Sequence, residues 1–296
     1  MGRLLSRVTR GRTQSQIQYV ATVPPGRAGG LVGEVYRQVE RDFGLLAPPM
    51  SLHAPAPTVL GAAWLMLRET LVATGQVPRA VKEAVAVAVS RSNACPYCVD
   101  VHQLALSSLT GGGAADWSPT AAPRLWAWAG ECALDQPAPA LPGPVRHAPE
   151  LIGTAVTFHY LNRMVNIFLV DSPVPAQASP SVRKVVEQLV PRVLRPLLRR
   201  PVAAGGSDQL LPAAELPEDL AWAAETPTVA SAFARAAAAI DAAGAGALPA
   251  SVCQLVRDEL AEWDGRPLGL GDWARSRLLP LPPEQRPIGR LALLTA

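Results

Sequence analysis

The spacing of apolar and polar residues along the chain predicts a protein built from helices. Residues 30–43 repeat apolar side chains about one turn apart with charged residues between them, which is typical of an amphipathic helix. The apolar run 58–74 predicts a second helix that ends near Gly75, and 150–170 carries one long apolar stripe. Further helical patterns cover 78–90, 96–109, 123–134, 183–198, 226–243, 249–263 and 284–296.

The segment 83–90 admits two interpretations. Its strict alternation of alanine and valine is compatible with a strand that has Val85, Val87 and Val89 on one face, and also with a buried helix. Alanine fills every second position, no hairpin turn flanks the segment and no partner strand is apparent, so we predict the helix. Since no other segment predicts a strand, the expected fold class is all-α.

The composition indicates a folded chain with a large core. Hydrophobic residues make up 49% of the sequence and charged residues 17%, below the ~25% charged content of an average globular protein. The 30 prolines are about twice the usual frequency and lie mostly in the connections between helices. Because single cores stop growing near ~250–300 residues, a chain of 296 residues favours two units.

We therefore expect four segments along the chain. Residues 1–16 are predicted to form a basic, disordered tail, and 17–170 the first helical domain. A proline- and arginine-rich linker, 171–219, carries one short helix, and 220–296 form a second helical domain. The second domain has the pattern of a degenerate, incomplete copy of the first, since the chain ends on an apolar run where the first copy goes on.

Charge and targeting signals favour a cytoplasmic protein. The net charge of +3 is small and the basic residues form no stripe with stacking aromatics, so we expect no nucleic-acid partner. The N-terminal segment lacks the apolar stretch of a signal peptide, and no apolar run reaches the ~18–20 residues of a membrane span. The four cysteines are then expected to stay reduced. Cys132 and Cys253 lie in semi-apolar settings and are predicted to be small core residues.

Four side chains within twenty residues form a candidate redox centre. Pro96 suits the first position of a helix, which makes Cys95 the N-cap and places Cys98 in the first turn, where the helix dipole is expected to lower its thiol pKa. His102 follows one turn after Cys98 on the same face. Glu83 lies on the preceding helix, and burial is expected to raise its pKa. Two thiols with an acid or base nearby are the equipment of a dithiol redox centre.

These residues resemble a known family. Glu83 and the segment Ser-Arg-Ser-Asn-Ala-Cys-Pro-Tyr-Cys-Val-Asp-Val-His, which ends at His102, look like the signature of alkyl hydroperoxidase D-like proteins of the carboxymuconolactone decarboxylase superfamily. Residues 157–163 also resemble the closing helix of its peroxidase-related members, and the resemblance covers about 17–170. It implies an all-helical bundle that assembles into a homo-oligomer.

The resemblance also implies a mechanism. Cys98 would attack a peroxide and become a sulfenic acid, and Cys95 would resolve it to a disulfide that an external dithiol, thioredoxin-like or lipoyl, reduces. Glu83 and His102 would form the proton relay, and no cofactor or metal is implied. The order of attack stays a hypothesis, since in thioredoxin-like centres the first cysteine is the nucleophile. Lactone decarboxylation is less expected, because that branch of the superfamily works without the cysteine pair.

Other interpretations remain open for the same residues. Cys95, Cys98, His102 and Glu83 are acceptable ligand types for a structural zinc ion, although such ligands usually come from turns and not from helices. A non-enzymatic redox sensor or scaffold, in which the disulfide alters oligomerisation, is a further alternative. Four more polar residues receive no chemical role at this stage: Asn162 is interpreted as a helix-packing or capping contact, His159 as a packing residue, and His53 and His147 as loop residues without a nameable partner.

Overall fold

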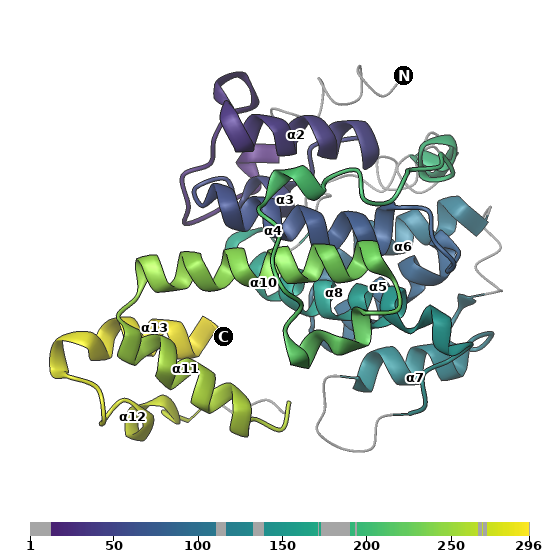
Figure 1. Ribbon diagram of the computed structural model, residues 1–296. Helices are drawn as coiled ribbons and strands as arrows, with labels where there is room; N and C mark the ends of the chain where they lie inside the picture. Colours follow the sequence, from purple (N-terminus) through teal and green to yellow (C-terminus); the bar gives the residue numbers. More distant parts are fainter. Residues whose placement is uncertain are drawn as a thin grey trace.

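The computed structural model describes residues 13–110, 117–132, 139–170, 172, 190–192, 194–265, 268 and 271–295, and these residues form an all-α bundle (Figure 1). Their only β-type pairing is a single antiparallel bridge between Ile17 and Leu169. No helix of the described residues is long and apolar enough to cross a membrane. Most of the basic tail and residues 173–189 of the predicted linker lie outside the described residues.

The helix α5 (Arg79–Ser92) lies at the centre of the bundle and is buried on nearly every side. It packs against α6 (Pro96–Thr110), α7 (Pro123–Glu131) and α8 (Ala148–Phe168). Its alternating alanines and valines therefore fill contacts all round a helix, and the helical interpretation of 83–90 is confirmed. The small alanine side chains allow the neighbouring helices to approach closely.

The helix α4 (Pro57–Leu67) begins with proline at its first position and runs directly into a π-helical turn, η2 (Arg68–Val72). Every residue of η2 is buried, including a charged pair, Arg68 and Glu69. The predicted helix 58–74 is thus two elements, because the wider turn rotates these charges toward partners far along the chain. The shorter helices α2 (Gly30–Asp42) and α3 (Pro48–Ser51) pack against α4.

The second half of the chain completes this core. The long helix α10 (Pro227–Ala247) packs along α4, and its Val229 and Phe233 belong to the same hydrophobic cluster. So do Leu210 and Leu211, which the sequence assigns to the linker. The predicted boundary between two domains stays a prediction, but residues from 17–170, 171–219 and 220–296 all lie in one cluster.

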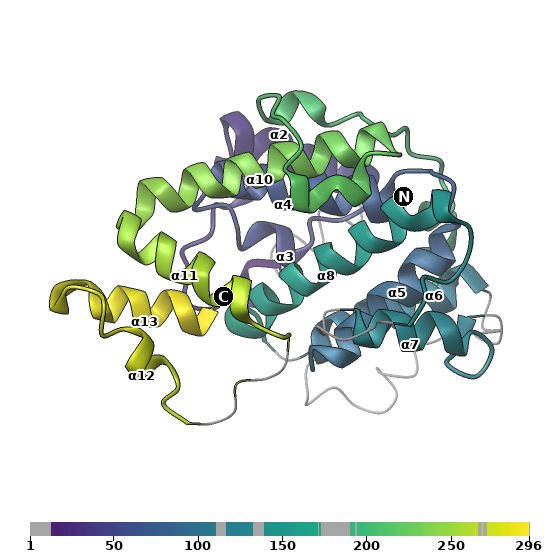
Figure 2. The ribbon, with the colours of Figure 1, turned by 60° about the horizontal axis from the view of Figure 1, so that its bottom comes forward.

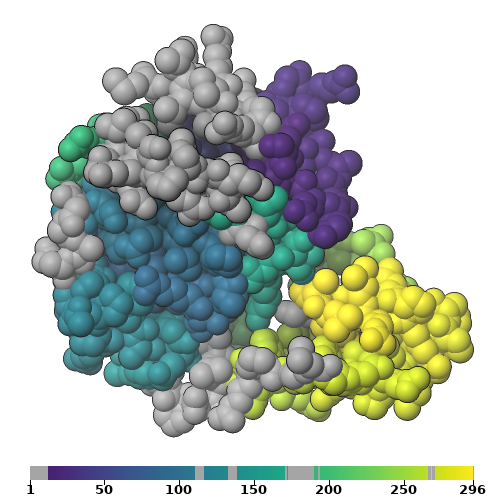
Figure 3. All heavy atoms as spheres, turned by 180° about the vertical axis from the view of Figure 1, so that it is seen from behind, coloured from purple at the N-terminus to yellow at the C-terminus, as the bar shows by residue number. Residues whose placement is uncertain are grey.

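The last helices form a smaller cluster at one end of α10 (Figure 2). They are α11 (Ala250–Glu262), α12 (Ala274–Arg277) and α13 (Arg286–Thr295). Gly289 is required where α13 meets the preceding turn, because a Cβ atom there would lie 2.5 Å from Leu281 Cδ1. Seen from behind, these residues form a lobe that projects from the body of the molecule (Figure 3).

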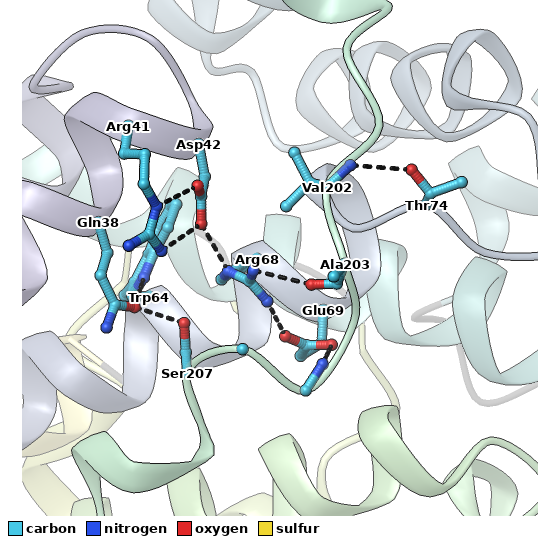
Figure 4. Close-up of polar contacts among 12 residues, drawn as sticks. Gln38, Arg41, Asp42, Trp64, Arg68, Glu69, Thr74, Val202, Ala203 and Ser207 are labelled. Carbon is cyan, nitrogen blue, oxygen red and sulfur yellow. Dashed lines mark hydrogen bonds and ion pairs between the residues drawn. The ribbon is translucent and has the colours of Figure 1, made fainter.

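A buried network of charges fastens the segment 202–207 to the π-turn (Figure 4). Arg68 donates to Asp42 Oδ2 at 2.9 Å and Glu69 Oε1 at 2.5 Å, and also to the backbone oxygen of Ala203 at 2.8 Å. The backbone N–H of Gly205 donates to Glu69 Oε2 at 2.9 Å. Three of these groups are charged and buried, so each depends on the others for its hydrogen bonds.

Candidate redox site

Cys95 and Cys98 lie at the N-terminus of α6, as the sequence predicts. The Cys95 carbonyl accepts the first helical hydrogen bond, from Val99 N at 3.0 Å, which makes Cys95 the N-cap before Pro96. Ala94 turns the chain with a left-handed φ of 47°, so that α6 folds back along α5. Both cysteines carry free thiols and are buried, with 0% and 4% of their surfaces exposed.

The two thiols differ in acidity. The hydrogen bond from the Cys98 thiol lowers the pKa of Cys95, and together with the Cys98 backbone N–H it outweighs burial. The contact with Cys95 and burial raise the pKa of Cys98 well above its ordinary value. The sequence predicts the lowered pKa at Cys98, and this is wrong, because the sulfur that receives the free N–H at the helix start is the N-cap sulfur of Cys95.

Glu83 and His102 are in direct contact. His102 Nδ1 lies 2.7 Å from Glu83 Oε2, and Arg79 donates to the other carboxylate oxygen at 2.7 Å. Burial raises the pKa of Glu83, but Arg79 and then His102 outweigh it, and the net pKa is lowered. The prediction that the pKa of Glu83 is raised is therefore wrong, because it took no account of Arg79, one turn before Glu83 on α5. The edge of the His102 ring packs on Phe158, with centroids 4.5 Å apart.

The orientation of His102 is set by these contacts. With Nδ1 directed to Glu83, the second ring nitrogen, Nε2, has no hydrogen-bond partner among the described residues. No hydrogen bond joins the ring to Cys95 or Cys98 in the described part of the chain. The structure thus brings Glu83 and His102 together and the two thiols together, while a proton relay between the pairs stays a prediction.

Asn162 is a residue of the site that the sequence interpretation assigns only to packing. It lies on α8, is fully buried, and its side-chain amide lies close enough to Cys95 and Cys98 to act in the direction of a lower pKa for each thiol. It also donates to Ser90 Oγ at 3.1 Å and accepts from Asn93 Nδ2 at 3.0 Å. The one sequence signal for Asn162 is its place in the segment 157–163. That segment resembles a helix of the family, but the resemblance indicates no contact with the cysteines.

Two further polar side chains, His159 and Cys132, extend the network of polar contacts from Asn93. His159 Nδ1 lies 3.0 Å from Asn93 Nδ2, and its Nε2 lies 3.6 Å from Cys132 Sγ. Burial, and then Arg163, lowers the pKa of His159 to about 4, and burial raises the pKa of Cys132 to about 11. Cys132 and Cys253 are only partly buried, and Cys132 packs against the main hydrophobic cluster, so the expectation of a core position is met in part by Cys132 and not by Cys253.

His53 also has partners that the sequence does not reveal. Its Nε2 lies 2.9 Å from the Tyr160 hydroxyl and its Nδ1 2.8 Å from the Pro49 carbonyl oxygen. Burial lowers the pKa of His53 to about 4, so the ring is neutral near neutral pH and holds α3 against α8.

A cavity of about 300 Å³ lies beside the thiols. Its walls come from both sides of Cys95 and from the end of α8, namely Ala94, Pro96, Tyr97, Val165, Asn166, Leu169 and Val170. The Tyr97 hydroxyl donates to Gln16 Oε1 at 2.8 Å, and the Gln16 carbonyl accepts from Val170 N at 3.1 Å. Gln16, at the end of the segment predicted to be a disordered tail, is thus ordered at the rim of the site.

The zinc alternative lacks geometric support. Within the described ranges, no three histidine, cysteine, aspartate or glutamate side chains converge as metal ligands do. His102 also directs Nδ1 to Glu83 and not to a point shared with the sulfurs. The fold and site instead define an all-helical protein with a dithiol at a helix N-terminus and a buried Glu–His pair beside it.

Comparison with known proteins identifies the family. The model of the carboxymuconolactone decarboxylase family matches residues 59–107, a range that holds the dithiol, Glu83 and His102. Alkyl hydroperoxide reductase Rv2159c of Mycobacterium tuberculosis is 36% identical over 290 residues, which cover 94% of this chain and 82% of that relative. No solved structure matches the chain significantly. The chain therefore belongs to the carboxymuconolactone decarboxylase family, among its alkyl hydroperoxidase D-like members.

Proposed function

We propose that the protein is a thiol-dependent hydroperoxide reductase whose redox centre is the Cys95–Cys98 pair. The observation that carries this proposal is the contact of two buried thiols at the start of α6, in which one thiol has a lowered pKa. A thiolate next to a second thiol can be oxidised and resolved without outside help. The name of the mycobacterial relative, alkyl hydroperoxide reductase, supports the same chemistry.

The proposed reaction has three steps. The Cys95 thiolate attacks the terminal oxygen of the hydroperoxide, the O–O bond breaks, and the alkoxide leaves as an alcohol after it takes up a proton. The Cys98 thiol then attacks the sulfenic acid, which forms the Cys95–Cys98 disulfide and releases water. An external dithiol transfers two electrons and two protons to the disulfide and restores both thiols. The scheme takes Cys95 as the attacking thiolate, where the family resemblance implies Cys98, because the N-cap sulfur accepts from the Cys98 thiol and the Cys98 backbone N–H, which lower its pKa.

Glu83 and His102 are the proposed proton relay. Glu83 holds the ring through Nδ1, which leaves Nε2 as the atom that takes up the thiol proton and returns it to the leaving alkoxide. The lowered pKa of Glu83 keeps the carboxylate charged near neutral pH, so that it stabilises a protonated ring.

Three further properties belong to the proposal. The physiological reductant is a thioredoxin-like or lipoyl dithiol, because the site holds no third thiol in contact with the pair among the described cysteines. The protein works in the cytoplasm, where such reductants keep thiols reduced. It assembles as a homo-oligomer, as the family resemblance implies.

Peroxide consumption by the full chain tests the proposal. We expect repeated turnover of hydrogen peroxide and of an organic hydroperoxide with dithiothreitol as electron donor. Turnover should be lost in Cys95→Ser and Cys98→Ser and kept in Cys253→Ser, a control thiol on α11. One equivalent of peroxide consumed, with no turnover and a change of oligomeric state, would instead establish the redox sensor.

A further inference from the structure

We propose that Asn162 is a positioning residue of the dithiol: its side-chain amide holds the turn before Cys95 and donates a hydrogen bond to the ionised sulfur. Its effect on turnover rests on the proposed function, whereas its effect on thiol ionisation does not.

The amide is fixed before any substrate arrives. Asn162 is fully buried, and it bonds Ser90 in the last turn of α5 at 3.1 Å and Asn93, which follows α5, at 3.0 Å. Ser90 in turn accepts from the backbone N–H of Cys95 through its carbonyl oxygen at 2.9 Å. One side chain of α8 thus sets the position of the N-cap cysteine from across the bundle.

The hydrogen bonds also set which end of the amide faces the sulfurs. Asn93 Nδ2 donates to Asn162 Oδ1, so the oxygen is occupied and turned away. Asn162 Nδ2 has two hydrogens, of which one goes to Ser90 Oγ and the other is available to sulfur. Asn93 itself is held by His159 Nδ1 at 3.0 Å, so the orientation does not depend on a single contact.

An uncharged hydrogen-bond donor suits the apolar surroundings of the two thiols. The thiols lie in an apolar cluster with Leu52, Val165 and Leu169, where burial opposes ionisation. A hydrogen bond to a thiolate stabilises the charged form, so Asn162 favours the thiolate without adding a charge that needs its own partner.

The titratable groups on the elements packed around the pair, in the described part of the chain, include Tyr97 and His102 on α6, Glu83 and Arg79 on α5, and His159 on α8. A substitution of Asn162 leaves all of these in place, so a change in thiol ionisation reports on the amide.

The test compares Asn162→Asp and Asn162→Ala with the native chain. Thr157→Val is the matched control, because Thr157 is also fully buried on α8 and its hydroxyl has no hydrogen-bond partner among the described residues, the two thiols included. The rate of alkylation of the cysteine pair by iodoacetamide is measured against pH, beside peroxide consumption against pH and thermal unfolding.

We expect Asn162→Asp to raise the pKa of the reactive thiol and to slow alkylation at neutral pH about tenfold or more, since one pKa unit is a tenfold change in thiolate. Asn162→Ala should shift the profile less in the same direction, and Thr157→Val not at all. Peroxide consumption should recover at high pH in both Asn162 variants.

Two results would overturn the inference: unchanged pH profiles in folded Asn162 variants, or activity lost equally at every pH. If Asn162→Asp does not fold, Asn162→Ala alone decides, because it adds no charge. If the native chain consumes no peroxide while the alkylation profiles still shift, the proposed function fails and the role of Asn162 in ionisation stands.

Discussion

The carboxylate of Glu83 lies 2.7 Å from Nδ1 of His102, although the two residues belong to different helices. The contact exists because α6 folds back along α5, which brings the second turn of α6 against the second turn of α5. Both side chains are buried, so neither has bulk water as an alternative partner. A buried acid–imidazole pair of this kind holds the ring in one orientation and one tautomer.

Glu83→Gln should lower kcat/KM for peroxide by about 10²- to 10⁴-fold, the usual range for loss of general acid–base catalysis. The amide is nearly isosteric but stabilises a protonated His102 poorly. Steady-state peroxide consumption with dithiothreitol measures the effect, and Glu262→Gln, at an exposed position of α11, is the control. Equal rates in the two variants would show that Glu83 has no part in the relay.

The lowered pKa values of Glu83 and Asp42 predict acid sensitivity. A carboxyl whose folded pKa is depressed contributes stability above its ordinary pKa, and this contribution is lost as the pH falls through the depressed value. Stability should therefore drop below the ordinary values of 4.5 and 3.8 for these two groups. Urea unfolding at a series of pH values measures the slope, which should be shallower in Glu83→Gln. Parallel slopes would contradict the assignment to Glu83.

Arg68→Met should lower the free energy of unfolding by about 3–5 kcal/mol, because it leaves Asp42 and Glu69 buried without their shared cation. Arg37→Met removes an ion pair with Glu34 in which the arginine side chain is 72% exposed, and should cost about 0.5 kcal/mol or less. Chemical denaturation of both variants gives the comparison. Similar losses in the two would mean that the buried network adds no more than a surface pair.

Tyr97→Phe should make the thiols more accessible without unfolding the protein. The variant loses the hydrogen bond to Gln16 that fastens the N-terminal segment over the cavity. A net hydrogen bond of about 1 kcal/mol corresponds to about a fivefold increase in the open population. The rate of Cys98 labelling by a bulky disulfide reagent measures this opening, with far-ultraviolet circular dichroism as the check on folding. An unchanged labelling rate would show that the reagent does not reach Cys98 past the Tyr97–Gln16 contact.

Local patterns in the sequence predict most of the helices. The helices at 30–43, 150–170 and 249–263 begin and end within a few residues of the predicted positions, because their apolar spacing is repeated over several turns. The dithiol at the start of α6 also follows from local rules for proline and the N-cap. The predicted helix 58–74 is less accurate, since its end depends on tertiary partners of Arg68.

The electrostatics of the site depend on contacts that no local pattern specifies. The pKa of Glu83 is lowered because Arg79 reaches it, and the pKa of Cys95 is lowered because its sulfur accepts first from the Cys98 thiol and then from the Cys98 backbone N–H. Asn162 lies 72 positions from Ser90, so its contact depends on how α8 crosses the bundle. Burial and hydrogen bonding compete within each of these groups, and only the three-dimensional arrangement decides the sign.

The packing of α10 along α4 has a consequence for protein engineering. The helices that carry the candidate redox site do not form a unit that can be cut out after α8. Phe233 of α10 would lie within 3.2 Å of a Cβ atom at Gly153 of α8, so the two surfaces are fitted closely to each other. Removal of α10 would expose apolar surface along α4 and α8, and copies of the shortened chain would associate through this surface. A transplant of this redox centre therefore has to carry the chain through residue 247.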